Sequence, residues 1–160
     1  MQLRQIVLKE IGIPAEMDCE LVSGDFEFSV YRIAHPNDLK GVYCNSHDEK
    51  YVDHLADSHG GKKRTPCTHQ DDLVFKTPNG FDDDVVYGVA SLGMLFRWFG
   101  RKEMLHLEKL GYKLYKFSSK DIYLYEHQCT IPLNNWLKSE REVVDIKHLV
   151  KTYKKPVAFN

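Results

Sequence analysis

The strongest periodic pattern in the chain lies between Ser91 and Gly111. Apolar residues recur there at the spacing of one helix face, namely Leu92, Leu95, Phe96 and Phe99. Ser91 is a candidate N-cap, because its hydroxyl can accept a hydrogen bond from the first turn. Gly100 interrupts the pattern, and a second helix is expected over residues 101–110, ended by Gly111. The sequence therefore predicts two consecutive helices in the middle of the fold.

Alternating apolar and polar residues on both sides of these helices predict strands. The segments are 17–21, 26–33, 112–117 and 122–131. The first two are expected to form a hairpin, and the last two a second hairpin or neighbouring strands. A short helix is predicted over residues 2–11, and the tail from Trp136 onward is mixed. We expect one compact α+β domain over residues 1–160, mainly of antiparallel strands with two central helices.

Residues 35–85 differ from the rest, being rich in His, Asp, Lys and Gly with little periodicity. Such an irregular segment is long for a connection in a compact domain, so we expect it to wrap a site or to carry short strands. It contains two candidate zinc-ligand pairs, Cys44 with His47 and Cys67 with His69. They lack the Cys-x-x-Cys spacing, and the alternative is that both cysteines are small buried residues.

The charge balance bears on partners, since 22 basic residues stand against 23 acidic ones. A net charge of −1 removes the overall attraction that drives non-specific nucleic-acid binding. The apolar runs are shorter than the roughly 18 residues of a membrane span, and the first residues lack the apolar core of a secretory signal. We therefore expect no membrane, no nucleic acid and a cytoplasmic location with reduced cysteines.

Four polar positions, Arg32, Ser91, Glu126 and Gln128, are candidates for a ligand site. Arg32 lies on a predicted strand with apolar neighbours, where an unpaired guanidinium is costly, so it should meet an anion from the protein or from a ligand. Glu126 and Gln128 stand two residues apart on a predicted strand and should share a face. The alternative is structural, with Arg32 paired to a core acid and Ser91 only capping its helix.

Several short stretches resemble small phage and prophage proteins. They are residues 30–36, 41–43, 88–92, 97–99, 110–112 and 127–128. The order of an early Arg, a central Ser and a late Glu or Gln also resembles the ADP-ribosyltransferase-like fold. This resemblance implies that NAD or a related nucleotide is bound, with catalytic roles for Arg32, Ser91, Glu126 and Gln128. It makes Tyr31, His35 and Tyr43 candidate ligand contacts.

One departure from the transferase pattern is the sequence Glu126-x-Gln128, where the family has Glu-x-Glu. A carboxylate stabilises a cationic sugar transition state better than an amide does, so activity stays open. The alternative is a host-takeover or anti-defence protein that binds a host protein without catalysis, using its nine tyrosines as contact surface. A second alternative is a zinc-binding module associated with nucleic acid.

Overall fold

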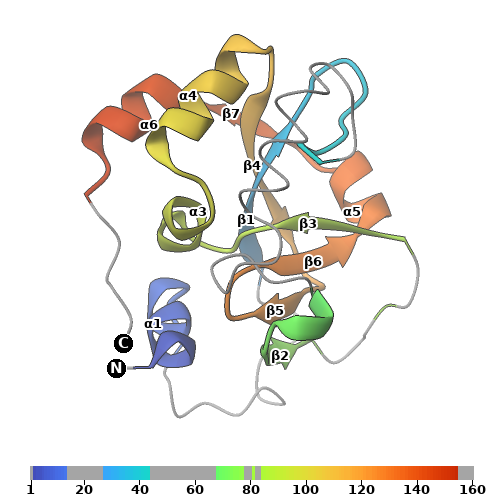
Figure 1. Ribbon diagram of the computed structural model, residues 1–160. Helices are drawn as coiled ribbons and strands as arrows, with labels where there is room; N and C mark the ends of the chain where they lie inside the picture. The colour runs from blue at the N-terminus through green and yellow to red at the C-terminus, as the bar shows by residue number, and fades with distance from the viewer. Residues whose placement is uncertain (1, 14–26, 44–67, 78–80, 82–83, 155–160) are drawn as a thin grey trace.

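The computed structural model describes residues 2–13, 27–43, 68–77, 81 and 84–154. Within these ranges the chain forms five α-helices, one short 3-10 helix and seven strands, arranged in two antiparallel sheets (Figure 1). The three-stranded sheet has the order β1-β4-β7, and the four-stranded sheet has the order β2-β5-β6-β3. The α+β class, the antiparallel strands and the two central helices are confirmed.

The three-stranded sheet is built around one long pair, β1 (Phe28–Ala34) and β4 (Lys113–Ser119). These strands run antiparallel from Phe28 opposite Ser119 to Ala34 opposite Lys113. The short strand β7 (Glu142–Val144) adds to the other side of β4. Phe28 and Val30 are buried, whereas Glu27 and Ser29 are exposed. One face of β1 therefore packs into the core, and the other is exposed at the start of the strand but buried again at Ile33.

The four-stranded sheet lies beside the first, at the lower right of Figure 1. Its strands are β2 (Leu73–Lys76), β3 (Val85–Gly88), β5 (Tyr123–Tyr125) and β6 (Cys129–Pro132). The 3-10 helix η2 (Thr68–Gln70) precedes β2. Strand β2 shows that the irregular 35–85 segment does carry a short strand.

The two sheets meet where Tyr31 and Val89 exchange backbone hydrogen bonds of 2.8 and 3.0 Å. This junction requires close approach of β3 to β1. A side chain at Gly88 would place its Cβ 2.9 Å from the backbone oxygen of Tyr31. Glycine at this position therefore lets the sheets join.

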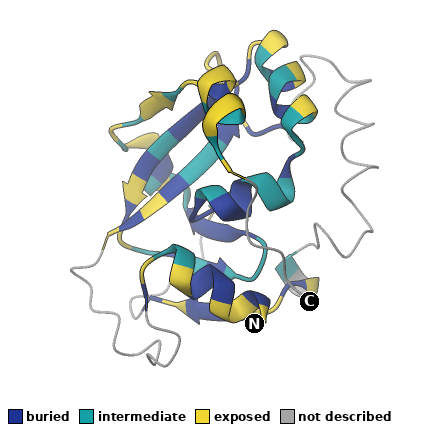
Figure 2. Cartoon of the chain, turned by 90° about the vertical axis from the view of Figure 1, so that its left-hand side faces the viewer, coloured by how far each residue is buried: buried dark blue, intermediate teal, exposed yellow. Residues whose placement is uncertain are grey.

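The helices pack around this pair of sheets. They are α1 (Leu3–Glu10), α3 (Leu92–Trp98), α4 (Arg101–Lys109), α5 (Leu133–Leu137) and α6 (Ile146–Thr152). Helix α1 contacts α3, α4 packs with α6, and α5 lies against strands of both sheets. Figure 2 shows the buried residues gathered where helices and strands meet. No helix in the described ranges combines the length and apolarity that crossing a membrane requires.

Three of the predicted helices are confirmed with small shifts of their ends. The expected helix over residues 2–11 is α1, and the two central helices are α3 and α4. Ser91 caps α3 by accepting a hydrogen bond from Met94 N at 3.0 Å. Gly111 follows α4 with φ of +97°, a left-handed conformation that favours glycine.

The second predicted hairpin is wrong. Strand β4 pairs with β1 and β7, whereas β5 belongs to the other sheet. The segment 122–131 is not one strand either, because a turn at residues 126–128 separates β5 from β6. In the first predicted hairpin, residues 17–21 lie outside the described ranges, and the described partner of β1 is β4.

Candidate functional site: the cleft between α1, β1 and α3

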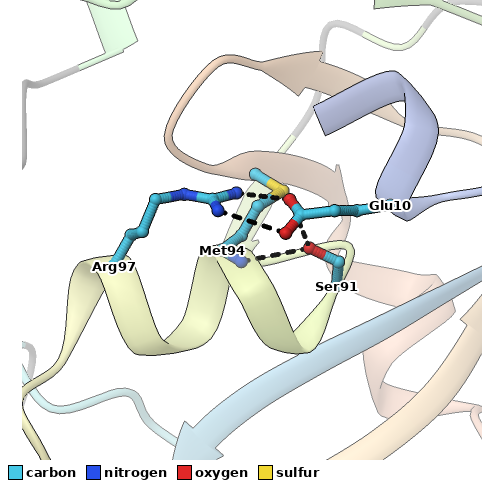
Figure 3. A network of polar contacts seen from close by, with 4 residues as sticks. All are labelled: Glu10, Ser91, Met94 and Arg97. Carbon is cyan, nitrogen blue, oxygen red and sulfur yellow. Dashed lines mark hydrogen bonds and ion pairs between the residues drawn. The ribbon is translucent and has the colours of Figure 1, made fainter. Parts of the chain in front are cut away.

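A polar network ties the end of α1 to α3. The carboxylate of Glu10 forms an ion pair with the guanidinium of Arg97, and Arg97 Nη1 donates to Glu10 Oε2 at 3.1 Å. The Ser91 hydroxyl donates to Glu10 Oε1 at 3.4 Å while it caps Met94 N. Figure 3 shows Glu10 reaching across from α1 to these groups on α3. Ser91 is therefore more than a cap, because it also orients a carboxylate.

Glycine at position 93 makes this approach possible. A Cβ there would lie 1.7 Å from Glu10 Oε2, so any side chain would displace the carboxylate. The side chains of Arg97 and Glu10 are only 11% and 18% exposed, so both charged groups are partly shielded from water. An ion pair of this kind holds its geometry more firmly than one on the open surface does.

A cleft of about 490 Å³ opens beside this network. Its walls come from α1, from β1 and from the start of α3, and the lining includes the small residues Ala90 and Gly93. The polar and aromatic residues on its walls are Glu10, Glu27, Phe28, Ser29, Tyr31, Ser91 and Tyr153. The alternation along residues 27–31 accounts for the polar ones from this strand, since residues 27, 29 and 31 share one face.

Tyr153 is held through its ring and through its backbone. It stacks on Phe96 with ring centroids 4.5 Å apart, and Arg101 Nη2 donates to the Tyr153 carbonyl oxygen at 2.9 Å. Burial, followed by the negative charge of Glu10, raises the pKa of the Tyr153 hydroxyl above its ordinary value of 10.0. The hydroxyl therefore stays protonated at neutral pH.

The structure brings together only part of the predicted site. Ser91 and Tyr31 line the cleft, whereas Arg32 is not among the described residues that do so. The guanidinium of Arg32 donates to the Tyr87 carbonyl oxygen at 2.7 Å and lies 5.3 Å from the centre of the Trp136 ring. The interactions shown for Arg32 are thus with a carbonyl group and an indole.

The remaining predicted ligand contacts lie in other places. His35 is buried with its ring edge-on to Tyr112, and Asn37 N donates to His35 Nδ1 at 3.3 Å. The Tyr43 hydroxyl accepts a hydrogen bond from Trp98 Nε1 at 3.0 Å, and 42% of Tyr43 is exposed. Neither residue is among those described along the cleft.

Gln128 belongs to a second polar group, around the buried carboxylate of Asp71. Asp71 Oδ1 lies 2.9 Å from His127 Nδ1, and Oδ2 accepts from His127 N and from Gln128 Nε2, each at 3.2 Å. The Asp71 side chain is fully buried. These bonds hold the turn between β5 and β6, so Glu126 and Gln128 lie in a turn and do not lie along one strand face as predicted.

Glu126 gives a testable pH dependence. Burial, followed by the negative charge of Asp72, raises the pKa of Glu126 above 4.5. Folding then favours the protonated carboxyl, so this contribution to stability is present below the unfolded pKa and is lost as pH rises through the folded value. Because Glu126 is partly exposed, we expect Glu126→Gln to stabilise the protein at about pH 7 by at most about 0.5 kcal/mol.

Thermal unfolding of Glu126→Gln at about pH 7 and about pH 4 checks this. The gain in melting temperature should shrink at the lower pH. Glu140→Gln, at an exposed position, is the control. An equal gain for both variants, or a gain that grows on acidification, would contradict the assigned shift.

The predicted metal site and the cysteines are described only in part. Cys44, His47 and Cys67 lie outside the described residues, as does the side chain of His69, so zinc binding there stays a prediction. No cluster of three metal-ligating side chains is found in the part of the chain that the structure describes. Cys129 is a free, buried thiol, and burial raises its pKa to about 12, which keeps it protonated and unreactive at neutral pH.

Sequence reasoning missed the residues that complete the cleft, above all Glu10, Glu27 and Tyr153. The alternation along residues 26–33 contained a signal for Glu27, because it shares a face with Tyr31. Glu10 had no such signal, since its partner Arg97 is 87 positions away.

Comparison with known proteins gives one finding. Residues 23–147 match the family described as Bacteriophage T4 Y00F protein, whereas the curated proteins and the solved structures yield no match. The finding confirms the prediction of a small phage protein and gives no support to the ADP-ribosyltransferase-like fold. The matched residues make up more than half of the chain, and the chain therefore belongs to the Bacteriophage T4 Y00F protein family.

Proposed function

We propose that this phage protein binds a nucleoside-like ligand in the cleft between α1, β1 and α3, with the cationic nicotinamide riboside portion of NAD as the preferred form. The observation that carries the proposal is the composition of the cleft walls, because carboxylates and tyrosine rings line the same space. Its volume of about 490 Å³ suits a ligand of this size.

The tyrosine rings provide the contact for a planar base. Tyr31 lies on β1 and Tyr153 follows α6, so the rings come to the cleft from separate elements. Aromatic rings stack on heterocycles, and a cationic ring gains further attraction from the electron-rich face of a tyrosine. A pyridinium ring is therefore favoured over a neutral base.

The polar groups match the sugar hydroxyls and the positive charge of the pyridinium ring. Carboxylates accept hydrogen bonds from hydroxyl groups, and the exposed Glu27 is placed to do so beside Ser29. Glu10 already pairs with Arg97, which makes Glu27 the carboxylate more available to a ligand. The described lining contains two glutamates and no lysine or arginine, so we expect the phosphates of a dinucleotide to point out of the cleft.

Ligand binding, rather than ADP-ribosyl transfer, is the function that we propose. Transfer would require the catalytic residues around one sugar. Arg32 and Gln128 contact Tyr87 and Asp71, and neither is among the described residues of the cleft. Ser91 and Tyr31 are the two predicted residues on which the proposal depends.

The test is calorimetric titration of the protein with nicotinamide riboside, uridine and NAD. Nicotinamide riboside should bind most tightly, and its affinity should fall as salt is added. We expect Glu27→Gln to weaken this binding about fivefold, the equivalent of about 1 kcal/mol for a partly exposed charge pair.

Glu142→Gln is the matched control, because Glu142 is exposed on β7 and is not among the cleft residues. It should bind nicotinamide riboside like the wild type. The proposal fails if neither nucleoside binds at concentrations up to about 10 mM, the range of the weakest measurable affinities. It also fails if Glu27→Gln and Glu142→Gln behave alike.

A further inference from the structure

The outer face of the four-stranded sheet carries a row of tyrosines. Directly opposed residues in an antiparallel sheet share a face, and the register places Tyr87 opposite Thr130, which in turn lies opposite Tyr123. Tyr125 is two residues from Tyr123 and lies opposite Leu73. Lys76 lies opposite Tyr123 and shares this face, so five side chains from β2, β3 and β5 point away from the core, whereas Thr130 between the tyrosines is buried.

The opposite face of the same sheet is the buried one. Phe75, Leu124, Val86 and Ile131 lie there, and none is more than 7% exposed. By contrast, Tyr87 is 49% and Leu73 45% exposed, among the largest exposures of apolar side chains in the described ranges. Solvent-facing aromatic side chains of this kind are typical of contact surfaces.

Tyr123 packs against Phe81, and Tyr125 lies near it on the same face. The ring of Phe81 packs on Tyr123 with centroids 4.5 Å apart, and Phe81 N lies 3.4 Å from the Tyr123 hydroxyl. Burial is the largest cause that raises the pKa of Tyr125, and the neighbouring groups Tyr123, Asp71 and Tyr87 raise it further. The mutual influence places the three tyrosines within one local environment.

One end of this tyrosine face is acidic. Glu126 follows Tyr125 directly, and Glu126 N donates to the Asp72 carbonyl oxygen at 3.0 Å, so the two acidic residues are neighbours. Arg4 Nη1 donates to the Leu73 carbonyl oxygen at 3.4 Å and offsets part of this charge. Aromatic rings beside carboxylates attract a cation and repel a phosphate backbone.

We infer that this tyrosine face docks an arginine-bearing segment of a partner protein, whose guanidinium groups stack on Tyr87 and Tyr125 and pair with Asp72 and Glu126. Arginine fits both parts of the surface, because its planar group stacks on aromatic rings and makes two parallel hydrogen bonds to a carboxylate. Lysine offers only a point charge. Tyrosine and arginine are also the residue types that dominate binding energy at protein interfaces.

The probe is a short peptide of alternating glycine and arginine, compared with its lysine and glutamate counterparts. The arginine peptide should bind best, the lysine peptide several times more weakly and the glutamate peptide not at all. Backbone NMR signals of Tyr87, Tyr125 and Glu126 should shift on titration. We expect Tyr87→Ala and Glu126→Gln each to weaken binding by about fivefold, or about 1 kcal/mol.

Two controls keep this result separate from ligand binding in the cleft. Tyr43→Ala removes another exposed tyrosine and should leave peptide binding unchanged. Glu27→Gln should also leave peptide binding unchanged, although this variant weakens nucleoside binding in the cleft. If Glu27→Gln abolishes peptide binding while Glu126→Gln keeps it, the peptide occupies the cleft and the inference is wrong.

Two further outcomes would overturn the inference. One is no binding of either cationic peptide up to about 5 mM. The other is tighter binding of a single-stranded oligonucleotide than of the arginine peptide, which would assign the tyrosines to base stacking.

Discussion

Replacing Trp136 with alanine is expected to destabilise the protein by about 3–5 kcal/mol, the usual cost of deleting a large buried aromatic side chain. Trp136 is 1% exposed and packs against Phe117 and Tyr115, with ring centroids 4.9 and 5.6 Å away. Its Nε1 donates to the Leu39 carbonyl oxygen at 3.2 Å. The variant would therefore lose both a core side chain and a long-range hydrogen bond.

Two arginines increase the expected loss. The guanidinium groups of Arg32 and Arg141 lie 5.3 and 4.7 Å from the centre of the Trp136 ring. Each contact of this kind contributes about 0.5–1 kcal/mol, or more where water is excluded. Trp136 thus connects the three-stranded sheet, α5 and Arg32, the residue that the sequence analysis named as a candidate for the ligand site.

Urea unfolding followed by circular dichroism measures the effect. Trp136→Phe should lose less, because a ring remains in the core while the Nε1 donor is removed. Leu137→Ala is the control, since Leu137 is the next residue of α5 and 48% exposed. If Trp136→Ala changes the free energy of unfolding by less than about 1 kcal/mol, the packing described around the indole is wrong.

Replacing Asp71 with alanine should have the second largest effect, a loss of about 2–4 kcal/mol. The fully buried carboxylate accepts hydrogen bonds from His127 N and from Gln128 Nε2 and lies 2.9 Å from His127 Nδ1. A buried polar group that loses its partner costs about 1–3 kcal/mol, and this change removes the acceptor of several donors at once. The turn between β5 and β6 should loosen.

Hydrogen exchange at His127 N together with thermal unfolding tests this prediction. Asp71→Ala should speed exchange at that amide and lower the melting temperature by roughly 4–16 °C, the range that corresponds to this loss in a chain of this size. Asp72→Ala is the matched control, because the neighbouring Asp72 is exposed. Equal stability of the two variants would show that the Asp71 bonds do not hold the turn.

Features that depend on near neighbours in the chain were predictable. The apolar spacing of residues 92–99 gave the position of α3, and Ser91 caps it through a contact only three residues away. Gly111 ends α4 for a reason that is also local, its positive φ. The interactions that stabilise these helix ends join residues within about one helical turn, so the spacing of residue types is enough to predict them.

The division of the strands between two sheets was not predictable in this way. Strands β4 and β5 are separated by only three residues, which suggested a hairpin, yet each pairs with strands from distant parts of the chain. A strand pattern shows which residues can form a ladder but not which partner buries the most apolar surface. That choice depends on the whole core.

The candidate site shows the same division. Local patterns along the chain were enough to predict the α+β class, the two central helices and Ser91 as the cap of α3. Only the tertiary structure brought Glu10 to Ser91 and Arg97, and Asp71 to the turn at residues 126–128. Those contacts join positions between 56 and 87 residues apart. Their charged groups are tolerated away from water because each carboxylate meets hydrogen-bond donors, and these bonds are stronger where packing has excluded water.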